Sequence, residues 1–431
     1  MFRTLSNFMR VADIRNKIIF TLLLLIVFRI GTFIPVPFTD KAAIDFMNDQ
    51  QNVFGFLNTF GGGALQNFSI FAMGIMPYIT ASIIMQLLQM DVVPKFAEWK
   101  KQGEMGRKKI AQVTRYGTIV LAFVQAIAMS VGFNAMAGGM LIANPNVMKF
   151  LTIAIVLTGG TAFLMWMGEQ ITAHGVGNGI SIIIFAGIVA ALPNGVGQLY
   201  SQYFANPGND LFINIVIVAL IALVAVAVTV GVIFVNQALR KIPVQYAKKL
   251  VNRSPVGGQS THLPIKVNAA GVIPVIFAIA FMMAPTTIAG FFEGNQVADF
   301  IIRTFDYTSP VGMVIYVAMI IAFTYFYTFV QVNPEQMSEN LQKQGGYIPG
   351  IRPGHNTEEY LTRVINRLTF VGALFLAVIS VFPMILGSLA NLPSAVQIGG
   401  TSLLIVVGVA LQTMKQLEGQ LVKRHYKGFI K

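Results

Sequence analysis

The chain has 431 residues, of which 55% are hydrophobic and only 11% are charged, and its mean hydropathy is +0.68. A water-soluble domain of this composition would not stay soluble, so the composition predicts a polytopic membrane protein. The chain has no cysteine, which excludes disulfides and thiolate metal sites. A net charge of +13 is compatible with a nucleic-acid partner, but in a membrane protein excess Lys and Arg first indicates orientation in the bilayer.

Ten apolar segments have about the length of a bilayer-spanning helix. They cover residues 18–38, 68–90, 116–136, 150–168, 178–199, 211–235, 268–292, 311–332, 368–390 and 398–414. All but the first contain no Asp, Glu, Lys or Arg. The fifth is interrupted by Pro193 and the tenth is short, so the predicted count of ten depends also on the loops.

The loops between these segments alternate in charge. All but four of the 30 Lys and Arg lie in the two tails and in every second loop, and the exceptions are Arg29, Lys41, Lys149 and Arg303. Such alternation is the positive-inside signature. It predicts an even number of spans with both termini in the cytoplasm.

The first segment follows a basic tail, as the apolar part of a signal peptide does. No small-residue cleavage site comes after "IIFTLLLLIVF", so the segment is predicted to be a retained span. Arg29 is the one charge inside it, and such a charge costs about 2.5 to 3.5 kcal/mol at a helix centre. We interpret Arg29 as a structural residue that is paired or that snorkels, and the sequence does not name its partner.

Residues 53–67, "VFGFLNTFGGGALQN", come before the second segment. They predict one short apolar helical piece and a hinge at Gly61, Gly62 and Gly63, too short to cross a bilayer and too apolar for an ordinary loop. Two interpretations stay open at this point. The segment either folds into the mouth of a cavity between two halves of the protein or lies on the lipid headgroups.

Two short sequences repeat a pattern of glycine, two apolar residues, proline, any residue and isoleucine. They are "GIMPYI" at residues 74–79 and "GVIPVI" at residues 271–276, and they fall in the second and seventh segments. Each is therefore second in a half of five, which predicts inverted repeats. The alternative is a chance pair of Gly and Pro kinks. With the alternating loops, the repeat is favoured.

Five longer blocks resemble the SecY family, the channel subunits of Sec protein translocons. They are "SIFAMGIMPYITASIIMQLL" at 69–88, "MGEQITAHGVGNGISIII" at 167–184, and residues 260–274, 345–354 and 399–407. The resemblance implies an all-α polytopic membrane protein with ten transmembrane helices in two pseudo-symmetric inverted halves of five, residues 1–200 and 201–431. It also implies a plug helix within residues 53–67 and a lateral gate between the second and seventh helices.

The function that the resemblance implies is a protein-conducting channel of the bacterial plasma membrane. It would move unfolded secretory polypeptides outward and release transmembrane segments into lipid. The implied pore ring is Ile75, Ile79, Ile180, Ile184, Ile276 and Ile405. Residues spaced by four share one helix face, and a narrow apolar ring blocks ions by dewetting. Without the resemblance these isoleucines would be ordinary lipid-facing or packing residues. The implied gate residues are Thr80, Gln86 and Gln125.

The resemblance also implies partners for the basic loops 236–267 and 333–367. Docking of the motor ATPase SecA or of ribosomal RNA is expected at Arg240, Lys241, Lys248, Lys249 and Arg352. Lys and Arg attract phosphate without reading a sequence, as rRNA docking requires. Asn236 and Gln237 stand where some relatives carry a charged pair, which leaves individual contacts there open. Further expected partners are SecE, SecG, signal peptides and membrane lipids.

Enzymatic functions find little support in the sequence. There is no Walker-type motif, "HGVGNG" at residues 174–179 lacks GxGxxG spacing, and the four histidines all lie in predicted loops or the tail. No cofactor or metal site is expected, and energy would come from a partner. The competing function is a secondary transporter, because inverted repeats with broken helices also describe that class. Nine charge-free segments argue against it, because transporters need ionisable groups near the midplane.

Overall fold

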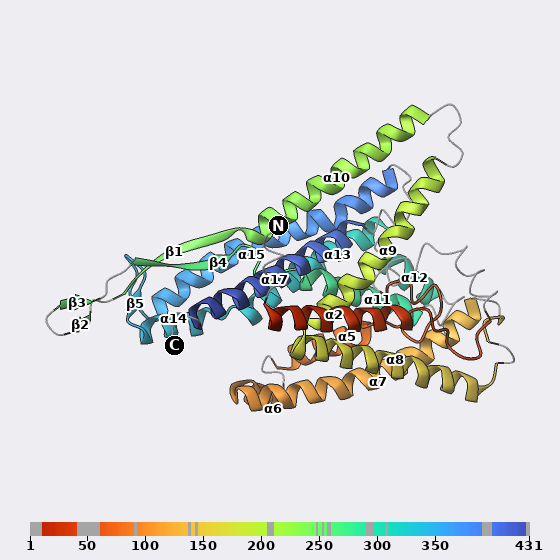
Figure 1. The fold of residues 1–431 in the computed structure, drawn as a ribbon, viewed down its shortest axis with the longest axis horizontal. Helices are drawn as coiled ribbons and strands as arrows, with labels where there is room; N and C mark the ends of the chain where they lie inside the picture. The colour runs from red at the N-terminus through yellow and green to blue at the C-terminus, as the bar shows by residue number, and fades with distance from the viewer. Residues whose placement is uncertain are drawn as a thin grey trace.

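The computed structural model is an elongated bundle of helices (Figure 1). It describes residues 11–40, 61–89, 93–136, 139–142, 145–204, 211–246, 249–251, 254–256, 260–289, 296–306, 309–389 and 399–427. The helices are α2 (Ala12–Gly31), α5 (Met76–Leu88), α6 (Pro94–Lys101), α7 (Glu104–Met136), α8 (Val147–His174), α9 (Gly179–Tyr203), α10 (Leu211–Gln237), α11 (Ile273–Ala289), α12 (Gln296–Phe305), α13 (Pro310–Gln331), α14 (Pro334–Lys343), α15 (His355–Leu389) and α17 (Gly399–Lys427). The strands are β1 (Leu239–Tyr246), β2 (Lys249–Val251), β3 (Ser254–Val256), β4 (Ser260–Lys266) and β5 (Gly346–Tyr347).

Each of the ten predicted apolar segments contains a helix. Six of these helices are long and apolar enough to cross a membrane, namely α7, α8, α9, α10, α13 and α15. Two more, α5 and α11, are apolar but shorter. The remaining two, α2 and α17, begin or end in charged sequence. Pro193 lies inside α9 and does not end it.

The second and seventh segments begin later than predicted. Residues 61–75 form turns and α5 starts only at Met76, while residues 267–272 form bends and turns before α11 starts at Ile273. The cause is shared: Gly74 has a φ of 56° and Gly271 a φ of 66°, in the left-handed region that favours glycine. A proline follows in the first turn of each helix, where its missing N–H is tolerated. The two sequence echoes therefore adopt the same backbone.

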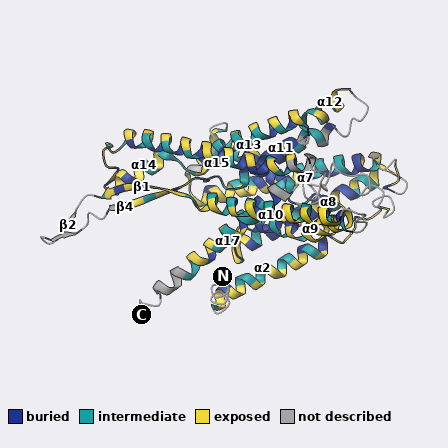
Figure 2. Cartoon of the chain, turned by 90° about the horizontal axis from the view of Figure 1, so that it is seen from above, coloured by how far each residue is buried: buried dark blue, intermediate teal, exposed yellow. Residues whose placement is uncertain are grey.

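The helices pack in two sets with the same order. In the first set α5 packs on α7, α7 on α8 and α8 on α9; in the second, α11 packs on α13, α13 on α15 and α15 on α17. The contact of α2 with α9 has its counterpart in the contact of α10 with α17. The two sets meet where α5 touches α11 and where α9 touches α17 and α10. Figure 2 shows the buried residues gathered along the middle of the bundle.

One end of the bundle carries a small sheet that the sequence did not predict. β1 pairs with β4 and β5 in the order β4-β1-β5, with Ile242 opposite Leu263 and Gln245 opposite Tyr347. Figure 1 shows α6, α14, the strands and the C-terminus at this end, and α12 at the opposite one. The strand that begins at Leu239 buries Ile242 and Val244 and exposes Pro243 between them, as alternation requires. We call this the basic end, because the described parts of the loops rich in Lys and Arg lie there.

Candidate functional site

The six isoleucines of the predicted ring lie in one continuous hydrophobic cluster. Ile75 caps α5 and Ile79 lies inside it, while the others come from α9, α11 and α17. Five of the six are between 0% and 8% exposed, and Ile180 is half-buried against the cluster. Four helices from both packing sets thus bring these side chains together. Purely aliphatic side chains offer no donor or acceptor to an ion or to water, so the predicted ring would stay dry.

The start of α9 is fixed by tight backbone contact with α8. A Cβ added to Gly179 would lie 1.9 Å from the carbonyl oxygen of Gly168, so only glycine allows this approach. The N–H of Gly179 donates to Thr172 Oγ1 at 2.9 Å, and the side chain of Asn178 accepts from the N–H of Ile180 at 3.1 Å. These caps satisfy N–H groups at the beginning of the helix. They also set the direction in which Ile180 and Ile184 leave α9.

The predicted glycine hinge is a turn that lies against α2 and α9. Gly62 has a φ of 66° and Gly63 a φ of 86°. A Cβ on Gly62 would lie 3.1 Å from Gly187 Cα on α9 and 3.5 Å from the ring of Phe28 on α2. Within the predicted plug, residues 61–67 form turns and not a helix, because these left-handed glycines interrupt helical geometry. Residues 53–60 of the predicted plug lie outside the described residues.

Arg29 finds its partner in this turn. Its Nη1 donates to the carbonyl oxygen of Gly62 at 2.6 Å, and its guanidinium lies 4.6 Å from the ring centroid of Phe33. Because α2 ends at Gly31, Arg29 lies in the last turn of its helix and not deep within a span. A cation there is also favoured by the helix dipole. The prediction of a paired arginine agrees with this geometry.

The segment after the turn is anchored to the chain that follows α2. The N–H of Val36 donates to the carbonyl of Phe68, and the N–H of Ile70 donates to that of Ile34, both at 3.0 Å. Asn67 Nδ2 donates to the carbonyl of Thr32 at 3.1 Å. Non-helical backbone among apolar helices needs such partners, since unpaired polar groups are costly there.

The predicted gate residues Thr80 and Gln86 lie on α5, the helix that touches both α7 and α11. Thr80 Oγ1 donates to the carbonyl of Met76 at 3.1 Å, and Gln86 Nε2 lies 3.4 Å from Ser82 Oγ. Gln86 Oε1 is buried and has no hydrogen-bond partner among the described residues. Gln125 is half-buried on α7. A buried amide oxygen without a hydrogen-bond partner lowers the stability of the closed arrangement around α5.

The predicted docking residues Arg240, Lys241 and Arg352 are all exposed, and the structure joins their two loops into one body. Ile242, Val244 and Ile265 of the sheet pack in one cluster with Leu341 of α14, Ile348, and Leu361 and Ile365 of α15. The backbone of the Arg352 loop is held by Thr357 Oγ1, which donates to the Arg352 carbonyl at 2.9 Å. The structure does not describe Lys248, nor the side chain of Lys249 in β2. This shared core was missed, although the alternation of Ile242, Val244 and Tyr246 was a signal for a strand.

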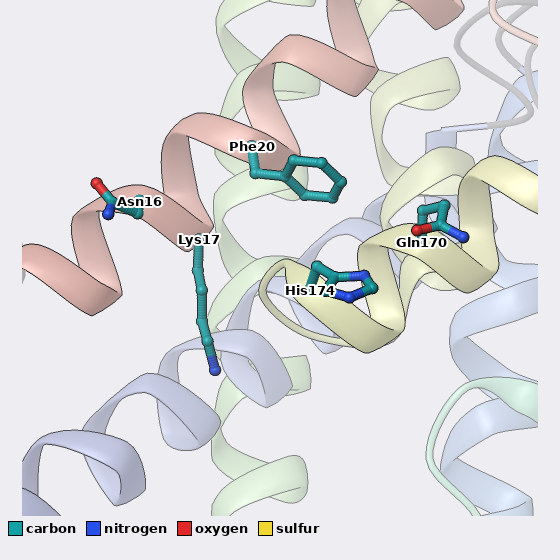
Figure 3. Close-up of a pocket in the computed structure, with 5 residues that line it drawn as sticks. All are labelled: Asn16, Lys17, Phe20, Gln170 and His174. Carbon is teal, nitrogen blue, oxygen red and sulfur yellow. The ribbon is translucent and has the colours of Figure 1, made fainter.

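One pocket lies apart from the six isoleucines. Figure 3 shows a pocket at the basic end between α2 and α8, lined by Asn16, Lys17, Phe20, Gln170 and His174. His174 is exposed and is the last residue of α8, not a loop residue as predicted. Among the residues that the structure describes, no group of three or more His, Asp or Glu could hold a metal ion.

Fold and site together define a polytopic helical membrane protein whose two helix sets meet around an apolar centre. The family described as SecY matches residues 69–414, and the chain belongs to this family. It is 69% identical to the protein translocase subunit SecY of Halalkalibacterium halodurans, with all of both chains covered.

The fold is likewise similar to solved structures. One, described as the structure of a protein conducting channel, has a TM-score of 0.62 at 21% identity and covers 95% of this chain and 93% of its own. Another, described as Sec61 in the canine ribosome-channel complex from the endoplasmic reticulum, has a TM-score of 0.58 at 20% identity and covers 95% and 93%.

Proposed function

We propose that this chain is the channel subunit of a protein translocase, which moves unfolded polypeptides across the bacterial plasma membrane and releases apolar segments sideways into lipid. One observation carries the proposal most directly. The six isoleucines, from α5, α9, α11 and α17, all belong to one hydrophobic cluster of 30 buried residues and the partly buried residues packed against it, and this cluster draws on both helix sets. A polypeptide that crosses between the sets must pass these side chains, and flexible aliphatic groups can fit around sequences of any kind.

The proposed division places residues 1–200 and 201–431 in two halves that separate during transport. The seam that would open runs between α5 and α11, which touch one another. Thr80, Gln86 and Gln125 would line it. The amide oxygen of Gln86, which has no partner among the described residues, would be hydrated when the seam opens. The glycine turn of residues 61–63 would be the hinge of the plug.

The proposed partners follow from the basic end, which would face the cytoplasm together with both termini. SecA or the ribosome would dock on the sheet and the Arg352 loop, because exposed Arg and Lys on a firm support attract phosphate and acidic groups. The ribosome-bound Sec61 structure has a similar fold, which supports this choice. SecE and SecG would complete the complex, and no enzymatic activity is proposed for the chain itself.

Site-specific crosslinking of a stalled secretory chain tests the proposal. A photo-crosslinking residue replaces Ile79 or Ile276 in one pair of variants, and Leu223 in a control. Leu223 lies on α10 and is 67% exposed, so it faces lipid or a partner. Crosslinks at both isoleucines and none at Leu223 are expected. Equal crosslinking at all three positions would remove the argument for a central path.

A vesicle assay separates the channel from the secondary transporter. Purified complex in vesicles should take up an unfolded signal-bearing polypeptide when SecA and ATP are present and not otherwise. Exchange of small solutes without uptake of the polypeptide would favour the transporter.

A further inference from the structure

The contact between Arg29 and the glycine turn brings a charged side chain to an unwound piece of backbone. The turn has buried surroundings: Ala64 is 0% exposed and belongs to the same hydrophobic cluster as Ile75 and Ile79. A buried carbonyl outside regular structure needs a hydrogen-bond donor. For Gly62, the donor is the guanidinium of Arg29, at 2.6 Å.

We propose that Arg29 is the positioning residue that fixes the glycine turn of residues 61–63 on α2 and α9, and thereby keeps the neighbouring Ala64 within the hydrophobic cluster that contains Ile79. The proposal deepens the proposed function, on which its consequence for transport rests. It assigns a role to the one charge that the first apolar segment contains. An arginine near the end of an apolar helix is costly unless its guanidinium is satisfied, and here one backbone carbonyl and one aromatic ring satisfy it.

The two ends of the segment are held differently, which makes the contact suitable for release. Near Phe68 and Ile70, two backbone hydrogen bonds and the Asn67 side chain tie the segment to residues 32–36. At Gly62, the hydrogen bond from Arg29 is the one long-range hydrogen bond found within the described part of the chain. Two left-handed glycines in succession resist helix formation and rotate easily. The turn can therefore detach while its anchor near Phe68 stays in place.

Substitution of Arg29 separates charge from bulk. Arg29→Met keeps an apolar stem of similar length and removes the donor, so the Gly62 carbonyl loses its partner. Arg29→Lys keeps a charged donor but loses the planar group that stacks on Phe33, so a partial effect is expected. Arg303→Met is the matched control, because it removes the same charge from an exposed position on α12.

The position of the turn can be read directly because the chain contains no cysteine. Ala64→Cys introduces one small thiol at a position that is 0% exposed. The full complex in proteoliposomes is treated from outside with a membrane-impermeant maleimide. With Arg29 intact, labelling should be slow. With Arg29→Met, it should be about ten- to a hundredfold faster, the range of a lost charge-assisted hydrogen bond.

The expected order of labelling rates is Arg29→Met, then Arg29→Lys, then wild type together with Arg303→Met. Passive ion leak through the proteoliposomes should follow the same order, since Ala64 beside the turn packs in the same hydrophobic cluster as Ile79. Equal labelling in wild type and Arg29→Met would overturn the proposal, as would an equal increase in Arg303→Met. Gel filtration checks that each variant is assembled. If labelling depends on Arg29 while no secretory chain crosslinks to Ile79, the positioning role stands and the proposed function fails.

Discussion

Replacing Ile79 by serine should make the closed protein leak ions. Ile79 lies on α5 and is 6% exposed within the hydrophobic cluster that contains the six isoleucines. Burial of an isoleucine side chain is worth about 1.5 to 3 kcal/mol, and serine gives up most of this and adds a hydroxyl that binds water. The cost of hydrating the constriction should fall by about 2 kcal/mol, which is about a thirtyfold rise in the hydrated fraction.

The same helix offers a matched control. Ile84 is 41% exposed, so Ile84→Ser makes the same chemical change on the outer side of α5. Single-channel recording in planar bilayers, without SecA or ribosome, measures how often each variant conducts. We expect frequent openings for Ile79→Ser and a wild-type trace for Ile84→Ser. If both variants conduct equally, or if neither does, Ile79 serves only in helix packing and does not form a barrier to ions.

Three other substitutions test the docking surface and the packing. Arg352→Glu should weaken SecA or ribosome binding about tenfold, because it reverses an exposed charge in the predicted docking loop. The control Arg363→Glu should leave binding unchanged. Comparable binding by both variants would contradict the assignment of Arg352 to the docking site. Gly160→Ala should lower the thermal midpoint in detergent and the free energy of unfolding by about 1 to 3 kcal/mol, because its Cβ would lie 1.9 Å from the carbonyl oxygen of Ile70. Gly159→Ala, which meets nothing within 4 Å, is its control, and equal midpoints would show the contact to be soft. Leu361→Ala should lower the free energy of unfolding by about 2 to 5 kcal/mol. The sheet should then become sensitive to limited proteolysis while the membrane helices stay protected. A sheet that stays resistant would show that its core does not depend on α15.

The ten apolar segments could be predicted because length and hydropathy act locally. Charge-free runs of about 20 residues form helices wherever the bilayer leaves the backbone no other partner. The starts of α5 and α11 could not be predicted in this way, since residues 68–75 are as apolar as the helix that follows. Their conformation depends on a left-handed glycine and on contacts with distant residues. A Cβ on Gly160, for example, would collide with the carbonyl of Ile70.

The site was predictable where a local motif carried it. The aligned blocks selected six isoleucines from four helices, and these lie in one cluster, although their role in a pore stays a prediction. The partner of Arg29 was beyond the sequence, because it is a backbone carbonyl 33 residues away that any residue type would offer. The sheet was missed for a different reason. Its strands are short, lie in loops between long apolar helices, and become stable only on the side chains of α14 and α15.

That shared core has a mechanical consequence. β1 follows α10 and β4 precedes α11 in the chain, while β5 precedes α15. Because these strands pair in one sheet, a partner that binds either loop is connected to both. A force applied to β1 and β4 would therefore be transmitted to the N-terminal ends of both α11 and α15. In the proposed function, a motor that binds these loops and moves a polypeptide outward would thereby also act on α11, one of the two helices of the seam between α5 and α11.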